Sequence, residues 1–367
     1  MLSTLVVERT IALGEIPAPT GREGGRAEVV ASWWRQDGWN NVRTDDAGNV
    51  WAQVRRGSGP PLLMCAHLDT VFDEEVSHGI RERAGRLVGP SVGDDTVGVA
   101  ALSAVGSLLQ DRGDGGSRPV WIVATVGEEG LGNLRGIRHA LSNQHGTIGA
   151  VVAVEGNYLG RVSTTGVGSL RWRIQLRGPG GHAWERSEAP SAVHAAAGLT
   201  VALADLSNDE PVGRGRATVN VGRMGGGQAI NARAQEAWLE VEIRADDAGA
   251  LDRMEASARS AVEGSSAGGI ESTIEELGRR AAGGIARDHA LAKAAVAGLA
   301  SAGWSSVFVA TSTDANAAYE LGIPAIAVGV TTGGGEHTRL EWIEIDPIAA
   351  GLTSLVETLA GFEVSTA

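Results

Sequence analysis

Histidine and carboxylate side chains follow shortly after four apolar runs of strand length in this chain. They are His67 and Asp69 after Pro61–Ala66, Glu128 and Glu129 after Val120–Val126, Glu155 after Ala150–Val154, and His337 after Ile323–Val330. A glycine-framed pair of carboxylates, Asp94 and Asp95, precedes an expected helix. Each of these residues alone is typical of a surface turn or a helix cap. Together they are the ligand types that suit a divalent zinc, cobalt or manganese ion.

The apolar runs predict how these side chains are positioned. Uninterrupted apolar runs that alternate with helical segments are typical of strands buried on both faces of a mostly parallel sheet, and so of an α/β fold. In open sheets of this kind, ligands bind beyond the carboxyl ends of the strands. We therefore expect the four strand ends to place their polar side chains in one crevice. The other expected elements are helices at 3–13, 23–37, 97–109, 136–142 and 288–302, and a strand at Val50–Val54.

The middle of the chain has a different pattern. Residues 170–176 alternate between apolar and polar side chains, which predicts a strand with one exposed face. Helices are expected at 191–206 and 248–264, and further strands at 216–223 and 236–244. This β-α-β-β-α order predicts a small α+β domain. We therefore expect a discontinuous metal-binding catalytic domain, residues 1–164 and 281–367, interrupted by an inserted lid or dimerisation domain, residues 165–280.

Composition narrows the classes of function. The 367 residues include 31 basic and 44 acidic side chains, and the net charge of −13 disfavours nucleic acid and anionic membrane surfaces as partners. Lys293 is the only lysine and Cys65 the only cysteine, so a Walker-type phosphate loop, an intrachain disulfide and a cysteine-based metal site are not expected. The N-terminal segment does not resemble a signal peptide, and no run of about 18 uninterrupted apolar residues occurs. We therefore expect a cytoplasmic protein without a membrane span.

Several short motifs occur in a fixed order along the chain. They are His67-Leu-Asp69-Thr70, Gly93-Asp94-Asp95, Gly127-Glu128-Glu129-Gly130, Glu155 and Gly334-Gly335-Glu336-His337-Thr338, with Gly178-Pro-Gly-Gly-His182-Ala, Gly225-Gly-Gly-Gln-Ala-Ile-Asn231 and Arg244 in the insert. They resemble, over nearly the whole chain, the motifs of the dinuclear-zinc metallopeptidases and deacylases. That family includes glutamate carboxypeptidase, acetylornithine deacetylase, succinyl-diaminopimelate desuccinylase, aminoacylase and peptidase T.

The resemblance implies a centre of two divalent metal ions, with zinc expected and cobalt or manganese as alternatives. Asp94 would bridge the two ions. His67 and Glu129 would complete one site, and Glu155 and His337 would serve the other. Two ions held about 3.5 Å apart would polarise the scissile carbonyl and lower the pKa of a bound water.

The resemblance also implies roles for the remaining motif residues. Asp69 would accept the second ring proton of the first histidine ligand. Glu128 would be the general base, taking a proton from the metal-bridging water and passing it to the leaving amine. His182, from the partner subunit of a homodimer formed through the inserted domain, would stabilise the tetrahedral oxyanion. Asn231 and Arg244 would hold the carboxylate of the substrate.

The substrate class stays open at this point. The family usually has a lysine two residues after the bridging aspartate, where this chain has Thr96, and we interpret this departure as drift at a supporting position in a chain with one lysine. Glu155 is more typical of the deacylases, whereas Asp94-Asp95 and Thr313-Asp314-Ala315-Asn316 look more like the peptidases. We expect hydrolysis of an amide bond in a short peptide or, alternatively, in an N-acyl amino acid. The complete ligand set argues against a third hypothesis, a catalytically silent binding protein.

Overall fold

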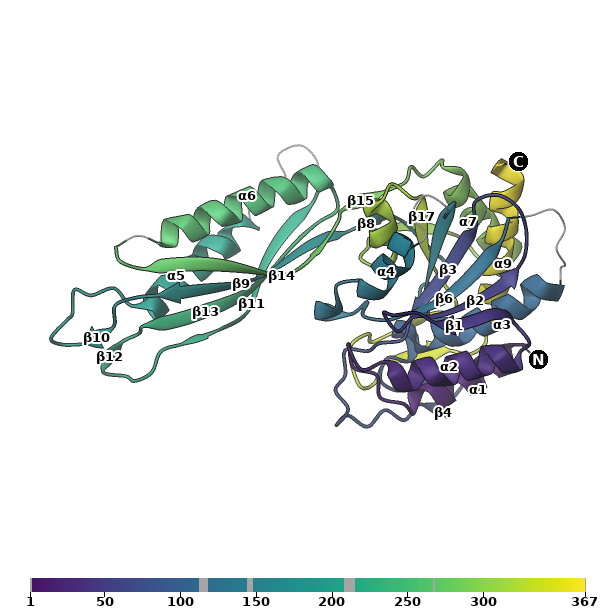
Figure 1. The fold of residues 1–367 in the computed structure, drawn as a ribbon, viewed down its shortest axis with the longest axis horizontal. Helices are drawn as coiled ribbons and strands as arrows, with labels where there is room; N and C mark the ends of the chain where they lie inside the picture. Colours follow the sequence, from purple (N-terminus) through teal and green to yellow (C-terminus); the bar gives the residue numbers. More distant parts are fainter. Residues whose placement is uncertain (1, 112–117, 144–147, 208–214, 267, 367) are drawn as a thin grey trace. The chain divides into compact units, whose positions relative to one another are not determined.

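The computed structural model describes residues 2–111, 118–143, 148–207, 215–266 and 268–366 (Figure 1). The chain divides into two compact units. The first comprises Met1–Gly166 and Gly284–Ala367, and the second is Val167–Gly283. The domain boundaries expected from the sequence, after residues 164 and 280, lie two and three residues before these division points.

A nine-stranded sheet forms the centre of the first unit. Its strands are β1 (Asn40–Thr44), β2 (Val50–Arg55), β3 (Leu62–His67), β6 (Val120–Thr125), β7 (Ala150–Glu155), β8 (Arg161–Gly166), β15 (Gly283–Gly284), β16 (Val307–Thr311) and β17 (Ala325–Gly329). The four middle strands run parallel in the order β6-β3-β7-β17, and β3, β7 and β17 are buried throughout, as continuous apolar runs predict. Antiparallel pairs flank them, because β2 pairs with β6 and β8 pairs with β17. The first unit therefore has the mostly parallel α/β fold that the sequence predicts.

Helices cover both faces of this sheet. The helices on one face are α1 (Leu2–Gly14), α2 (Gly24–Gln36), α3 (Val97–Asp111), α7 (Ala290–Ser301) and α9 (Ile348–Thr366), and those on the other are α4 (Arg135–Asn143) and α8 (Ala315–Glu320). Successive side chains of β3 point to opposite faces, so Met64 packs with α3 in the larger core whereas Leu63 and Cys65 pack with α4 and α8. By length and apolar composition Val92–Asp111 is a candidate membrane span, but 83% of its most apolar part is buried inside the protein, as in a core helix.

A small antiparallel sheet lies beside the main one and carries the segment that includes His337. Its strands are β4 (Arg81–Arg83), β5 (Arg86–Val88), β18 (Gly333–Gly334) and β19 (Trp342–Glu344), in the order β18-β19-β5-β4. The pairing of β5 with β19 brings the segment before α3 next to the segment that follows β18. Two metal-ligand motifs about 240 residues apart in the sequence are thereby connected, because Gly89 N–H donates to the carbonyl oxygen of Glu341 at 2.9 Å.

The second unit is a four-stranded antiparallel sheet with two helices on one face. Its elements are β9 (Gly168–Arg177), β11 (Ala217–Gly226), β13 (Glu236–Ala245), β14 (Glu271–Arg280), α5 (Ala192–Leu206) and α6 (Ala248–Ser265), with a separate ribbon formed by β10 (Gly181–His182) and β12 (Ala232–Arg233). Buried Leu170, Trp172 and Ile174 face the helices, as the alternation in β9 predicts. The expected β-α-β-β-α order omitted β14, a sequence in which half of the residues are charged and which does not indicate a strand.

Candidate active site

The strand ends that carry the predicted ligands lie at one edge of the main sheet. His67, the last residue of β3, is level with Thr125 at the end of β6, and Glu155 at the end of β7 is level with Gly329 of β17. Parallel strands in direct register place their carboxyl ends together. His67 and Glu155 are both buried, with 2% and 8% of their surface exposed.

Asp94 lies between two histidines. Its Oδ1 is 2.8 Å from His67 Nε2 and its Oδ2 is 3.2 Å from His337 Nε2. Burial alone would raise the pKa of Asp94, but hydrogen bonds to the two imidazoles hold it well below its ordinary value. The two oxygens of one carboxylate therefore face two different nitrogen ligands, which is the arrangement that a bridging ligand requires.

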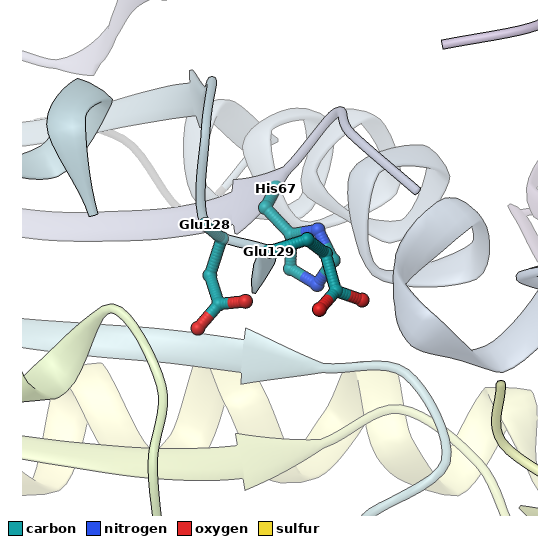
Figure 2. Close-up of side chains that lie close together, drawn as sticks. All are labelled: His67, Glu128 and Glu129. Atoms are coloured by element: carbon teal, nitrogen blue, oxygen red, sulfur yellow. The ribbon is translucent and has the colours of Figure 1, made fainter. Parts of the chain in front are cut away.

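Asp69 positions the loop that carries both glutamates. Its Oδ1 accepts the N–H of Glu128 at 2.9 Å, and its Oδ2 accepts the N–H of Glu129 at 2.9 Å and the hydroxyl of Thr20 at 2.8 Å. Figure 2 shows the Glu129 carboxylate beside the imidazole of His67, and Glu128 on the same loop reaches the same group, since potential ligand atoms of all three residues lie within 4.8 Å of one another. Burial would raise the pKa of Asp69, but His67 and the two backbone N–H groups lower it overall.

The second ring nitrogen of His67 faces Asp69. His67 Nδ1 lies 3.0 Å from the backbone carbonyl oxygen of Asp69, whereas the carboxylate Oδ1 is 3.6 Å away. The backbone carbonyl is the nearer acceptor, and the carboxylate also accepts three other donors. This contact leaves Nε2 of His67 directed at Asp94.

The carboxylate of Asp95 accepts hydrogen bonds from the ends of both β3 and β7, a role that the sequence did not reveal. Its Oδ2 accepts the backbone N–H of His67 at 3.2 Å, and its Oδ1 accepts the N–H of Gly156 at 2.8 Å. The side chain is fully buried, and a Cβ on Gly98 would collide with Oδ1. Asp95 thus fixes the positions of the ends of β3 and β7, from which His67 and Glu155 project.

The predicted ligands form overlapping groups whose potential ligand atoms lie within 4.8 Å of one another. These groups are His67 with Asp94 and Glu155, Asp94 with Glu129 and His337, and His67 with Glu128 and Glu129. Two of the groups share Asp94, as a bridged pair of metal ions would need. The two groups that share Asp94 join His67 with Glu155 and Glu129 with His337, and the predicted pairing of His67 with Glu129 occurs in the third group. Glu129 joins His337 because Nε2 of His337 is 3.4 Å from Glu129 Oε1.

The electrostatics of this cluster fit divalent cations. Burial and the neighbouring Asp94 raise the pKa of Glu129 to about 7, and burial with Asp95 raises the pKa of Glu155 well above its ordinary value. Oε1 of Glu129 is buried and lies 3.4 Å from His337 Nε2. The carboxylates of Asp94, Glu128, Glu129 and Glu155 together carry a formal charge of −4, which two divalent ions would balance. Carboxylate oxygen and imidazole nitrogen are also suitable donors for such ions.

His337 differs from the other predicted ligands in its exposure and backbone. Its side chain is 57% exposed, and its φ of +62° lies in the left-handed region that non-glycine residues rarely adopt. Hydrogen bonds to Asp94 and Glu129 raise its pKa to about 10. Such backbone strain is often found at functional residues that the surrounding structure holds in place.

The three predicted residues of the insert do not all lie together. His182 in β10 is opposite Ala232 in β12, and Asn231 accepts the N–H of Ala183 at 2.9 Å, so His182 and Asn231 share one end of the second unit. Arg244 lies near the other end of β13, eight residues from its start, or roughly 25 Å at the rise of an extended strand. Asn231 and Arg244 of one chain are therefore too far apart to hold the same carboxylate.

The structure also accounts for Thr96 at the position of the family's lysine. The guanidinium of Arg26 is fully buried beside it, with Nη1 3.2 Å from Thr96 Oγ1 and 3.1 Å from the carbonyl oxygen of Leu68. Burial lowers the pKa of Arg26 to about 10, while the charge of Asp69 acts to raise it. A cation therefore lies beside Thr96, and α2 supplies it.

An α/β sheet whose strand ends bring together acidic and imidazole ligands, interrupted by an α+β insert, defines a class of metal-dependent hydrolases. Over residues 63–361 the chain matches the family described as Peptidase family M20/M25/M40, and it belongs to that family. Members of this family are metal-dependent hydrolases with a dinuclear centre.

Individual relatives are more distant. A probable carboxypeptidase of Paracoccidioides brasiliensis is 25% identical over 300 residues, which cover 74% of this chain and 66%, just under two thirds, of that protein. Aminopeptidase PepT of Bacillus cereus has a TM-score of 0.81 at 20% identity, covering 98% of both chains. A tripeptidase of Staphylococcus aureus has a TM-score of 0.83 at 20% identity, covering 99% of both chains. At this identity the two structures establish the fold.

Proposed function

We propose that this protein is a peptidase that hydrolyses an amide bond of short peptides at a centre of two divalent metal ions. The observation that carries the proposal is the position of Asp94 between His67 and His337, with the loop of Glu128 and Glu129 beside them. Zinc is the expected metal, with cobalt and manganese as alternatives, because the ligands are nitrogen and carboxylate oxygen without sulfur. Bound ions would lower the pKa of a coordinated water and polarise the substrate carbonyl.

Glu128 is the general base in this proposal. Its side chain is 6% exposed, and its backbone N–H is held by Asp69, so its orientation is set before substrate arrives. It lies next to the ligand Glu129 in sequence without being part of either group that shares Asp94. Its carboxylate would take a proton from the attacking water and deliver it to the nitrogen of the leaving amine.

The choice of a peptide substrate is supported by the structural neighbours, two of which are described as an aminopeptidase and a tripeptidase. An N-acyl-amino-acid deacylase is the second candidate, and Glu155 is the residue that favours it. A hydrolysis screen decides between them, with dipeptides and tripeptides set against N-acetyl and N-succinyl amino acids in the presence of zinc, cobalt or manganese. Hydrolysis of the peptides supports the proposal. Exclusive hydrolysis of the acylated amino acids would replace it with the second candidate, and no hydrolysis of either class would contradict both.

We also propose that the insert dimerises and that His182 and Asn231 act in the partner subunit's site, since both lie at one end of the second unit. His182 Nδ1 faces the backbone N–H groups of Trp184 and Glu185 at 3.3 and 3.4 Å, which leaves the exposed Nε2 as a donor for a developing oxyanion. Arg244 would hold the substrate carboxylate. It shares Glu242 with Arg171, and this concentrates positive charge on one sheet face.

Mixed dimers test this second proposal. Glu128→Gln and His182→Ala subunits are each expected to be nearly inactive alone. In a dimer that contains one of each, one site has an intact Glu128 and an intact His182 from the other subunit. Random re-association should therefore restore about a quarter of wild-type activity, because half of the dimers are mixed and each has one complete site. Activity no higher than that of the separate variants would show that His182 does not act across an interface.

A further inference from the structure

Glu341 is a buried carboxylate outside the predicted ligand set, four residues after His337. Its side chain is fully buried although residues 335–340, which precede it, are exposed. We propose that Glu341 is a positioning residue for the metal centre, because its carboxylate holds the backbone of Asp94 while its own segment carries His337. This inference rests on the proposed metal centre, and it adds a residue that determines how that centre is built.

The evidence is a pair of short hydrogen bonds. Oε1 of Glu341 accepts the backbone N–H of Gly93 at 2.7 Å and that of Asp94 at 2.7 Å. Both distances are at the short end of the range for N–H···O hydrogen bonds. The contact also explains the glycine in the motif, since a Cβ on Gly93 would lie 2.9 Å from the same oxygen.

The backbone of Glu341 strengthens this link. Its carbonyl oxygen accepts the N–H of Gly89 at 2.9 Å, so Glu341 holds both ends of the segment that leads into Asp94. Its own N–H donates to the carbonyl oxygen of Thr338 at 3.2 Å, and Thr338 N–H donates to that of Gly335 at 3.1 Å. The loop that carries His337 is thus a series of tight turns that ends at the buried carboxylate.

The consequence is that one side chain sets the separation of two ligands. Asp94 and His337 come from segments that share no long element, and both belong to the same group of potential ligands. The left-handed backbone of His337 and its exposed side chain show that its own packing does not fix it. Residues that orient metal ligands in this way typically contribute about 10- to 100-fold to metal affinity.

The test compares metal affinity in three variants of the full chain. Glu341→Ala removes the acceptor, and Glu341→Gln retains an oxygen that can accept both N–H groups. Glu344→Ala is the matched control, because it removes an exposed carboxylate of β19 that pairs with Arg86. Zinc affinity is measured by competition with a chromophoric chelator, and the coordination of bound Co²⁺ by its visible absorption spectrum. Thermal unfolding of the metal-free proteins reports stability separately.

We expect Glu341→Ala to bind zinc about 10- to 100-fold more weakly and to show an altered Co²⁺ spectrum, with Glu341→Gln much closer to wild type and Glu344→Ala unchanged. A folded Glu341→Ala protein with wild-type affinity and spectrum would overturn the inference, as would an equal loss in the Gln and Ala variants. If the Ala variant does not fold, Glu341→Asp is used in its place. Its carboxylate is one methylene further from the backbone of Asp94, so zinc binding should be weaker in a folded protein. Unchanged zinc affinity in this variant would overturn the inference. Wild-type protein that binds no metal would instead contradict the proposed function.

Discussion

Replacement of Asp69 by asparagine should disrupt the loop of the general base without changing the size of the side chain. The two carboxylate oxygens of Asp69 accept three hydrogen bonds, from the N–H groups of Glu128 and Glu129 and from the hydroxyl of Thr20. An amide has a single acceptor oxygen, so in either orientation its NH₂ group faces one of the backbone N–H groups. One buried donor is then left without an acceptor, and the remaining bonds lose the charge of the carboxylate.

The magnitude follows from these contacts. An unsatisfied buried donor costs about 1–3 kcal/mol, and exchange of a charged acceptor for a neutral one weakens each remaining bond by about 1 kcal/mol. The expected cost is therefore about 3 kcal/mol, divided between the free energy of unfolding and the affinity for metal. If all of it fell on metal binding, affinity would decrease by about 150-fold. Because the same loop carries Glu128, we expect a decrease in kcat as well.

Three measurements test this reasoning. Denaturant unfolding of the metal-free protein gives the loss of stability, chelator competition gives the zinc affinity, and hydrolysis at saturating metal gives kcat. Thr20→Val is the matched control, because it removes one donor from the same carboxylate and should cost only about 1 kcal/mol. Asp69→Asn protein with wild-type stability, zinc affinity and kcat would refute the role of this carboxylate.

Two further variants and one change of pH test other parts of the site. Glu128→Gln should retain zinc affinity and lose about 10²- to 10⁴-fold in kcat, and near-normal turnover would contradict its role as the general base. In the metal-free protein the pKa of Glu129 is raised to about 7. Protonated Glu129 therefore stabilises the fold fully below about pH 4.5, and this stabilisation is lost as the pH rises through 7. Zinc should consequently raise the Tm more at pH 8 than at pH 6, and an equal rise at both would contradict this. Thr96→Lys would bury a second cation against Arg26 and should lower the free energy of unfolding by about 3 kcal/mol or more. The Arg26→Met, Thr96→Lys double variant should recover this stability, and denaturant unfolding measures both effects.

The predictable part of the fold is the part encoded by local patterns. The runs in β3, β7 and β17 are apolar at every position because both faces of these strands are covered by helices. Their ends can therefore be located from the sequence, and the polar residues that follow can be assigned to one edge. By contrast, half of the residues of β14 are charged, and this segment becomes a strand because β9 offers it a pairing edge.

The supporting residues of the site could not be identified in this way. Asp95 and Glu341 act by accepting backbone N–H groups of segments that are distant in the sequence, at Gly156 and Gly93. An acidic residue in a loop has the same appearance in the sequence whether it faces water or a buried N–H group. Their roles depend on burial, which only the packed chain determines.

The sequence by itself therefore determined the identity and order of the residues at the strand ends, and with them the type of fold and chemistry. The tertiary structure decided how those residues combine. His67 joins Glu155 and Glu129 joins His337, with Asp94 common to both groups, and Asn231 lies far from Arg244 along the same unit. The physical reason is that a strand pattern depends on neighbouring residues, whereas these pairings depend on loops held by hydrogen bonds between segments far apart in the chain.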